Sequence, residues 1–102
     1  MSKEDLKNED GSYNTELVMK HISELDEELL GGWTSCMRGK IVRHYGPEVD
    51  ACVNSITHST SNWKAILKCI VSVKGITNPE VWIPEQILLF TGWAAVCLFG
   101  EE

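Results

Sequence analysis

The sequence predicts an all-α fold, a small single-domain helical bundle of about five helices around a buried hydrophobic C-terminal helix. Three observations predict it. From Ile87 to Phe99 only Thr91 and Gly92 are not plainly apolar, and a helix that is apolar on every side has to be surrounded by other groups. Apolar residues in most of the earlier segments recur at helical spacing. The length of 102 residues suits one domain.

The C-terminal helix is expected to begin at Pro84, because a proline at the first helical position loses no intrahelical hydrogen bond. Glu85 and Gln86 then fall in the first turn, where the helix dipole favours a carboxylate. Residues 84–99 would span about 24 Å as a helix, less than the roughly 30 Å of a bilayer hydrocarbon core. We therefore expect a buried core helix and no membrane span. A tail anchor and a buried pair of strands are the alternatives.

The rest of the chain divides into a mobile acidic tail, residues 1–13, and a helical domain, residues 14–102. The tail has few apolar side chains to hold it against a core. Asn14 or Thr15 can cap the first helix of the domain. The pair Gly31-Gly32 is expected to end that helix.

Three further helices are expected before the C-terminal one, because their apolar residues recur every three or four positions. They cover residues 33–45, 47–56 and 63–73. In the last of them, the run 69–73 is rich in β-branched residues and would also suit a strand. Helix is the favoured interpretation there, and strand is the alternative.

The net charge of −6 is concentrated toward the N-terminus. Residues 1–30 contain nine Asp and Glu against three lysines, whereas residues 31–102 contain six acids and six Lys or Arg. A protein that binds a phosphate backbone needs clustered Lys and Arg. This balance therefore argues against direct nucleic-acid binding.

The cysteines are expected to be reduced thiols. No basic segment near the N-terminus is followed by an apolar run, so we expect no signal peptide and a cytoplasmic location, in the host cytoplasm if the chain is viral. Cysteines in that compartment are seldom paired. All of them lie among apolar neighbours, where Cys acts as a small hydrophobe. They are Cys36, Cys52, Cys69 and Cys97.

Residues that carry catalysis or hold a metal do not occur in recognisable patterns. The chain has no Cys-x-x-Cys and no His-x₃-His, so a zinc site would need the convergence in space of Cys36, His44, Cys52 and His58. Gly31-Gly32 lacks the flanking pattern of a phosphate-binding loop. The basic residues near Cys36 are the one hint of an activated thiol. We therefore expect a protein that is not an enzyme and has no cofactor or metal.

Four tryptophans in a chain of this length indicate either a densely packed small core or a binding surface. On the second interpretation, one or two of them line a groove for an amphipathic helix of another protein. The residues expected on the groove wall are Trp63, Ile66 and Ile70, with Trp93 in support. The chain is then a non-enzymatic protein–protein interaction module.

Several short motifs support that interpretation. Residues 62–66 (Asn-Trp-Lys-Ala-Ile) resemble the Asn-Trp-Gly-Arg-Ile of the first homology motif of the Bcl-2 family of apoptosis regulators. Residues 82–83 (Trp-Ile), 92–95 (Gly-Trp-Ala-Ala) and 98–100 (Leu-Phe-Gly) resemble the second motif. Five positions are similar to the third: Val18, Ile22, Leu25, Glu27 and Leu29. The resemblance implies a viral or host regulator of apoptosis that binds amphipathic helices, such as a shortened viral member.

The alternative is a small acidic inhibitor, encoded by a phage or virus, that docks on a basic, nucleic-acid-binding surface of a host protein. Its carboxylates would take the place of phosphates, and the association would be sensitive to salt. The acids expected to do this are Glu24, Glu27 and Glu28, with Asp26 beside them. For either role we also expect that the chain can form a homodimer, because a small core and spare tryptophans favour a symmetric pair.

Overall fold

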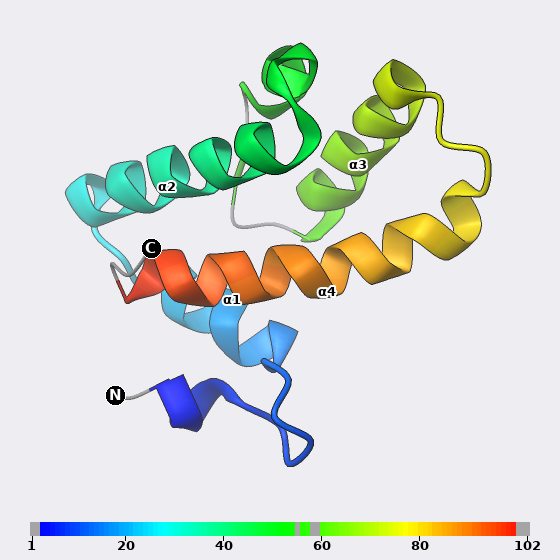
Figure 1. Ribbon diagram of the computed structural model, residues 1–102. Coiled ribbons are helices and arrows are strands. Elements are labelled where there is room, and N and C mark those ends of the chain that lie inside the picture. Colours follow the sequence, from blue (N-terminus) through cyan, green and yellow to red (C-terminus); the bar gives the residue numbers. More distant parts are fainter. Residues whose placement is uncertain (1–2, 55, 58–59, 100–102) are drawn as a thin grey trace.

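The fold is all-α, as predicted. The computed structural model describes residues 3–54, 56–57 and 60–99, and within them the chain forms four α-helices and two short 3₁₀ helices without a strand (Figure 1). In chain order they are η1 (Lys3–Leu6), α1 (Thr15–Ser23), α2 (Glu27–Tyr45), η2 (Pro47–Val53), α3 (Thr60–Lys74) and α4 (Pro79–Leu98).

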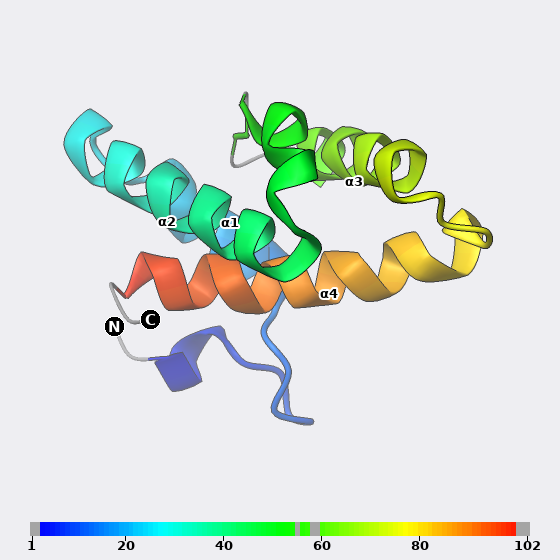
Figure 2. The same cartoon turned by 45° about the horizontal axis from the view of Figure 1, so that its top comes forward.

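The C-terminal helix α4 is the element on which the others assemble. It contacts α1, α2 and α3. Figure 1 shows α2 and α3 along one side of α4 and the N-terminal segment on the other, and this arrangement persists after the rotation in Figure 2. The buried face of α4 is formed by Phe90, Thr91, Ala94, Ala95 and Cys97.

The start of α4 differs from the prediction. The helix begins at Pro79, and Pro84 lies inside it. Pro79 takes the first helical position after Asn78. The N–H of a residue at this position makes no intrahelical hydrogen bond, so a proline there costs none. Pro84 lies in the second turn, where it leaves the carbonyl of Glu80 without its helical donor.

The first half of α4 has an exposed side, whereas its composition predicted a helix surrounded on every side. Val81 and Leu88 are 60% and 65% exposed. By length and composition α4 is apolar enough to cross a membrane, and 28% of its most apolar 18-residue stretch is buried. The core helix of a soluble protein passes the same test, so this finding leaves the expectation of no membrane span as a prediction.

The predicted first helix is in fact two. α1 ends at Ser23, and α2 begins at Glu27 and continues through Gly31-Gly32 to Tyr45. The side chain of Asp26 accepts a hydrogen bond from the Leu29 N–H at 2.9 Å, which is a helix N-cap. The prediction that the two glycines end a helix was therefore wrong. A strong cap upstream and three buried residues downstream, Trp33, Met37 and Ile41, hold them in helical conformation.

The middle of the chain agrees with the prediction except at one element. The segment 69–73 is helical, as the favoured interpretation had it, within α3. The expected helix at 47–56 is instead the 3₁₀ helix η2, which ends at Val53.

The N-terminal segment makes more contacts than a free tail would. Leu6 in η1 is fully buried in the core, and Lys7 and Tyr13 form an isolated antiparallel bridge. The Asn14 N–H donates to the Leu6 carbonyl at 2.7 Å. One leucine was too weak a signal to indicate this packing in the sequence, where residues 1–13 were predicted as a mobile tail.

The cysteines are paired, so the expectation of reduced thiols was wrong. Cys36 of α2 is bonded to Cys97 of α4, and Cys52 of η2 to Cys69 of α3. The Cα atoms in these pairs are 5.8 and 5.7 Å apart. Spacing in the sequence could not reveal this, because helix packing brings each pair together. The cytoplasmic location remains a prediction, and reduced thiols no longer support it.

Candidate functional site

The predicted groove wall lies in the core. Trp63 and Ile70 are fully buried and Ile66 nearly so. The Trp63 ring packs edge-on against Phe90 of α4 with centroids 5.9 Å apart, and its indole N–H donates to the Thr57 carbonyl at 2.9 Å. In this structure a partner can touch these three residues only if the core opens.

Trp93, the supporting residue, is half-buried at the surface. Its ring lies 5.2 Å from that of His44 and 5.5 Å from that of Phe90. Phe90 thus separates Trp93 from Trp63, so the two predicted tryptophans share a neighbour but no surface. A shallow hollow of about 310 Å³ beside Trp93 is lined by Lys40, Arg43 and His44 of α2.

The aromatic side chains around Trp93 continue into the interior through Tyr45. Its ring lies within 6.4 Å of those of Trp82, Phe90 and Trp93. The hydroxyl donates to the Gln86 side-chain oxygen, and burial raises the pKa of Tyr45 well above its usual range. Tyr45 is therefore a neutral structural hydroxyl.

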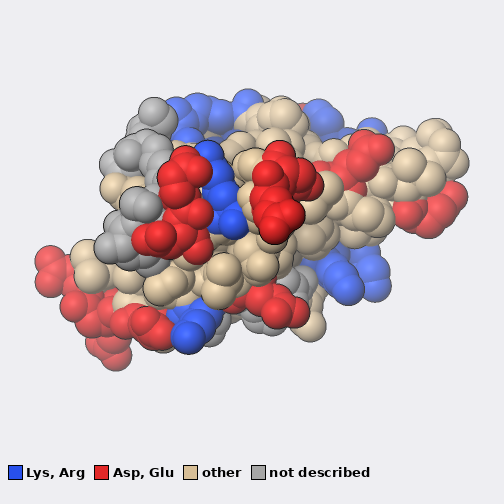
Figure 3. Space-filling view, turned by 90° about the horizontal axis from the view of Figure 1, so that it is seen from below, with Lys and Arg blue, Asp and Glu red and all other residues tan. Residues whose placement is uncertain are grey.

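The predicted acids lie where α1 passes into α2, and all are exposed. The Glu24 carboxylate is 4.0 Å from Nδ1 of His21. Glu27 and Glu28 stand in the first turn of α2, where the helix dipole favours them. Figure 3 shows acidic side chains in separate clusters with Lys and Arg between them, so the face drawn there is not uniformly negative.

An apolar hollow adjoins these acids. We call it the Leu29 hollow; its volume is about 540 Å³, within the range of ligand pockets. The start of α2 and the end of α4 form its two sides. Its lining is Leu25, Glu28, Leu29, Gly32, Trp33, Cys36, Cys97, Leu98 and Phe99.

Two links between α2 and α4 hold the sides of the Leu29 hollow together. One is the disulfide between Cys36 and Cys97, which both line it. The other is the hydrogen bond from the Trp33 indole N–H to the Ala94 carbonyl, 3.1 Å long. The hollow is therefore a preformed feature of the fold.

Leu29 is the most exposed apolar side chain of this hollow, being 59% exposed. Sequence reasoning missed the hollow because it ended the first helix before Gly31. On that boundary Leu29 belonged to the core stripe of the first helix. The Asp26-Glu27-Glu28 run is the signal that could have found it, since a capping residue followed by acids marks a helix start.

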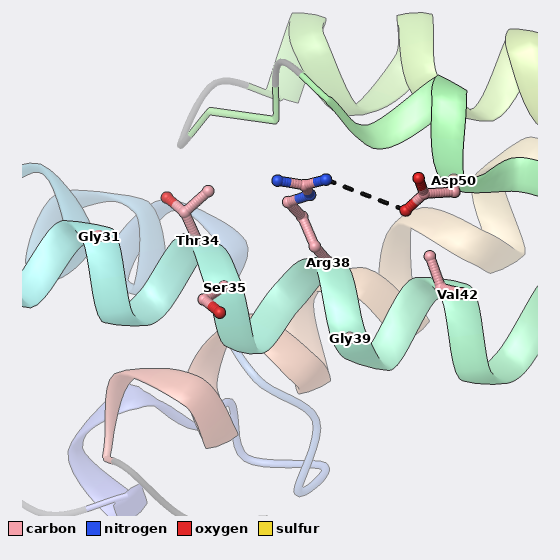
Figure 4. A pocket seen from close by; sticks show the side chains of 7 residues that line it. All are labelled: Gly31, Thr34, Ser35, Arg38, Gly39, Val42 and Asp50. Atoms are coloured by element: carbon pink, nitrogen blue, oxygen red, sulfur yellow. Dashed lines mark ion pairs between the residues drawn. The ribbon is translucent and has the colours of Figure 1, made fainter. Parts of the chain in front are cut away.

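A second hollow, the Arg38 hollow, lies between α2 and η2 (Figure 4) and has a volume of about 380 Å³. Arg38 Nη2 is 3.9 Å from the Asp50 carboxylate and donates to the Asn54 side-chain oxygen at 3.2 Å. This ion pair neutralises the centre of the hollow and links the two elements. The lining is Gly31, Thr34, Ser35, Arg38, Gly39, Val42 and Asp50.

Within the residues that the structure describes, no three His, Cys, Asp or Glu side chains converge to hold a metal ion. Comparison with protein-family models, with curated proteins and with solved structures finds no match to this chain. The resemblance to the Bcl-2 family therefore remains a prediction.

Proposed function

We propose that this protein is an interaction module that binds an amphipathic helix of another protein in the Leu29 hollow. The observation that supports this most directly is the exposed Leu29 at the edge of a hollow whose other sides include Leu25, Trp33 and Phe99. A single exposed leucine is ordinary. A leucine beside an unfilled apolar hollow is what helix-in-groove recognition uses, because a partner helix presents apolar side chains at i, i+3 and i+4.

The charges around the hollow indicate a basic partner. Glu28 lines it, Glu27 is next to Glu28 in the same turn, and Glu24 lies just before α2. Exposed ion pairs contribute roughly 0.2–1 kcal/mol each, whereas burying a leucine side chain contributes about 1.5–3 kcal/mol. Apolar burial therefore sets the affinity, and the acids select the orientation and speed of association.

Isothermal titration calorimetry with designed peptides tests this proposal. One peptide is an amphipathic helix with lysines flanking its apolar stripe, the second has glutamates in their place, and the third has the same composition with the stripe scrambled. We expect the first peptide to bind most tightly, the second to bind more weakly and the scrambled peptide not to bind. Equal heat from the first and the scrambled peptide, or none from any peptide, would contradict the proposal.

Matched variants locate the site. Leu29→Ser should weaken binding of the lysine peptide at least tenfold, because it removes the exposed wall of the hollow. Leu88→Ser is the control, since Leu88 is equally apolar and about as exposed but lies on α4 away from the hollow. A similar loss in both variants would point to nonspecific apolar adsorption.

Two narrower proposals differ in the surface they use and in their response to salt. Regulation of cell death, which the Bcl-2 resemblance implies, predicts that ligand helices of apoptosis regulators bind at the Leu29 hollow. An acidic inhibitor, supported by the exposure of Glu24, Glu27 and Glu28, would bind a folded basic surface. That association would disappear at moderate salt and would be insensitive to Leu29→Ser.

A further inference from the structure

One exposed side of α2 carries opposite charges at its two ends. We call it the outer face and define it by Glu28, Gly32, Ser35, Gly39 and Arg43. Steps of four, three, four and four residues place these positions in one row along the helix. Gly39 is half-buried and the other four are exposed. The row covers sixteen residues, about 22 Å.

The charges at the two ends have no ionic partner in the part of the chain that the structure describes. Neither Glu28 nor Arg43 forms an ion pair with any residue that the structure describes. Arg43 donates from Nε to the Gly39 carbonyl of its own helix, at 3.3 Å. By contrast, Arg38 on the neighbouring side of α2 lies near Asp50. The outer face therefore offers one acid and one base to whatever covers it.

The positions on the outer face are related by symmetry. Glu28 and Arg43 are equally far from the midpoint between residues 35 and 36, and so are Gly32 and Gly39. A second α2 running antiparallel about a two-fold axis at that midpoint brings each acid opposite a base. Such an isologous contact uses the same surface twice, so every pair forms two times.

The two glycines leave room for a close approach. A Cβ atom at Gly32 would meet nothing within 4 Å, and one at Gly39 would meet only the Arg43 guanidinium, at 3.6 Å. Both lie inside a helix, where glycine is less favourable than alanine. At Gly32 no contact with the described part of the chain requires glycine, whereas at Gly39 the Arg43 side chain folds over the helix. A neighbouring helix can approach closely beside Gly32, and beside Gly39 once the Arg43 side chain turns toward its partner.

We propose that two copies of this chain pair through the outer faces of α2, antiparallel and two-fold symmetric, with Glu28 of each copy against Arg43 of the partner subunit. Charge complementarity favours a second copy of this chain as the partner, because a face with one acidic and one basic end complements its own reversed copy. Figure 4 shows Thr34, Arg38 and Val42 beside Ser35 and Gly39, and the Arg38 hollow gives room for side chains at the edge of the contact.

Sedimentation equilibrium over a wide concentration range, at low and moderate salt, tests the pairing. We expect a reversible dimer whose dissociation constant rises with salt. Glu28→Arg and Arg43→Glu should each weaken it at least tenfold, and the double variant should restore it. Glu80→Arg and Lys64→Glu, exposed charge reversals elsewhere, are the controls. A wild-type monomer at every concentration, or a dimer indifferent to the single reversals, would overturn the proposal.

A second variant keeps the test informative if the reversals disturb folding. Gly39→Ala favours the helix, so it should raise the melting temperature of the dilute monomer while weakening the dimer at least threefold. An unchanged dimer would contradict close packing at Gly39. Glu28 and Gly32 also line the Leu29 hollow, so a second copy and the lysine peptide compete for them. Arg43 does not line the hollow, so Arg43→Glu should weaken the dimer and leave binding of the lysine peptide equal or tighter, which separates this proposal from the proposed function.

Discussion

The indole N–H of Trp33 donates to the backbone carbonyl of Ala94 across 3.1 Å. This bond joins the middle of α2 to the most buried part of α4 and lies beneath the Leu29 hollow. Both residues are almost fully buried. The fold and the proposed binding site therefore depend on the same contact.

Removing that bond should destabilise the protein measurably. Trp33→Phe deletes the donor and part of the buried ring, so we expect a loss of about 1–3 kcal/mol in the free energy of unfolding. Urea denaturation followed by circular dichroism measures it. Trp93→Phe is the control, because Trp93 is half-buried at the surface. A loss as large in the control would show that the buried bond is not what matters.

The two disulfides should differ in their contribution to stability. Cys36–Cys97 closes a loop with a sequence separation of 61, and Cys52–Cys69 one of 17. In the chain-entropy model the longer loop is worth about 1 kcal/mol more. Replacing each pair with serines and comparing the denaturation midpoints tests this. A larger loss from the shorter loop would mean that native packing, not loop entropy, dominates.

The start of α2 rests on a single side chain. Asp26→Ala removes the cap on the Leu29 N–H and should cost about 1 kcal/mol, within the usual range for N-caps. Asp26→Asn, which retains an acceptor, should restore most of it. Thermal denaturation of the three proteins compares them. Equal melting temperatures would show that the helix begins without help from residue 26.

The free energy of unfolding should depend on pH through the carboxyl group of Glu48. The Lys74 ammonium donates to its carboxylate and holds the pKa of Glu48 below its usual range. A carboxyl whose folded-state pKa is depressed contributes stability above its unfolded-state pKa and loses it as the pH falls through the folded-state pKa. The stability difference between wild type and Lys74→Gln should therefore be present at pH 6 and shrink on acidification below about pH 4.

Melting temperatures of both proteins between pH 3 and pH 6 test this pH dependence. Because Glu48 is exposed, added salt should reduce the effect. A constant difference across the whole range would exclude the pair as its source.

Two glycines should respond to alanine in opposite directions. Gly31 is helical and a Cβ there would meet nothing within 4 Å, so Gly31→Ala should stabilise the protein by about 0.5–1 kcal/mol. Gly46 has a φ of 104°, and a Cβ there would fall 2.5 Å from the Glu48 side chain, so Gly46→Ala should destabilise it. Denaturation midpoints that shift in the same direction would contradict these backbone assignments.

The fold class followed from the sequence because it depends on periodicity, a signal that each helix carries within itself. The helix faces that this spacing indicates are buried, for example at Val18 and Ile22 in α1 and at Trp33, Met37 and Ile41 in α2. Helix boundaries were less predictable because competing local signals decide them. The Asp26 cap starts α2, and the helix then continues through Gly31-Gly32. Pro79, and not Pro84, is the first residue of α4.

The candidate site was not predictable in the same way, because it depends on packing between distant segments. Trp63 was expected at a groove on the strength of its residue type, yet it packs against Phe90 in the core. The Leu29 hollow joins α2 to residues 97–99, and no pattern within either segment indicates the other. The cysteine pairs have the same origin, since Cys36 and Cys97 meet only when α2 lies on α4.

The central claim is that a basic amphipathic helix binds in the Leu29 hollow, and amide chemical-shift mapping of the labelled protein tests it most directly. On titration with the lysine peptide, we predict shifts concentrated in residues 25–36 and 97–99, with little change at Trp63, Ile66 or Ile70. Shifts centred on those three residues, or none above background at saturating peptide, would contradict the account.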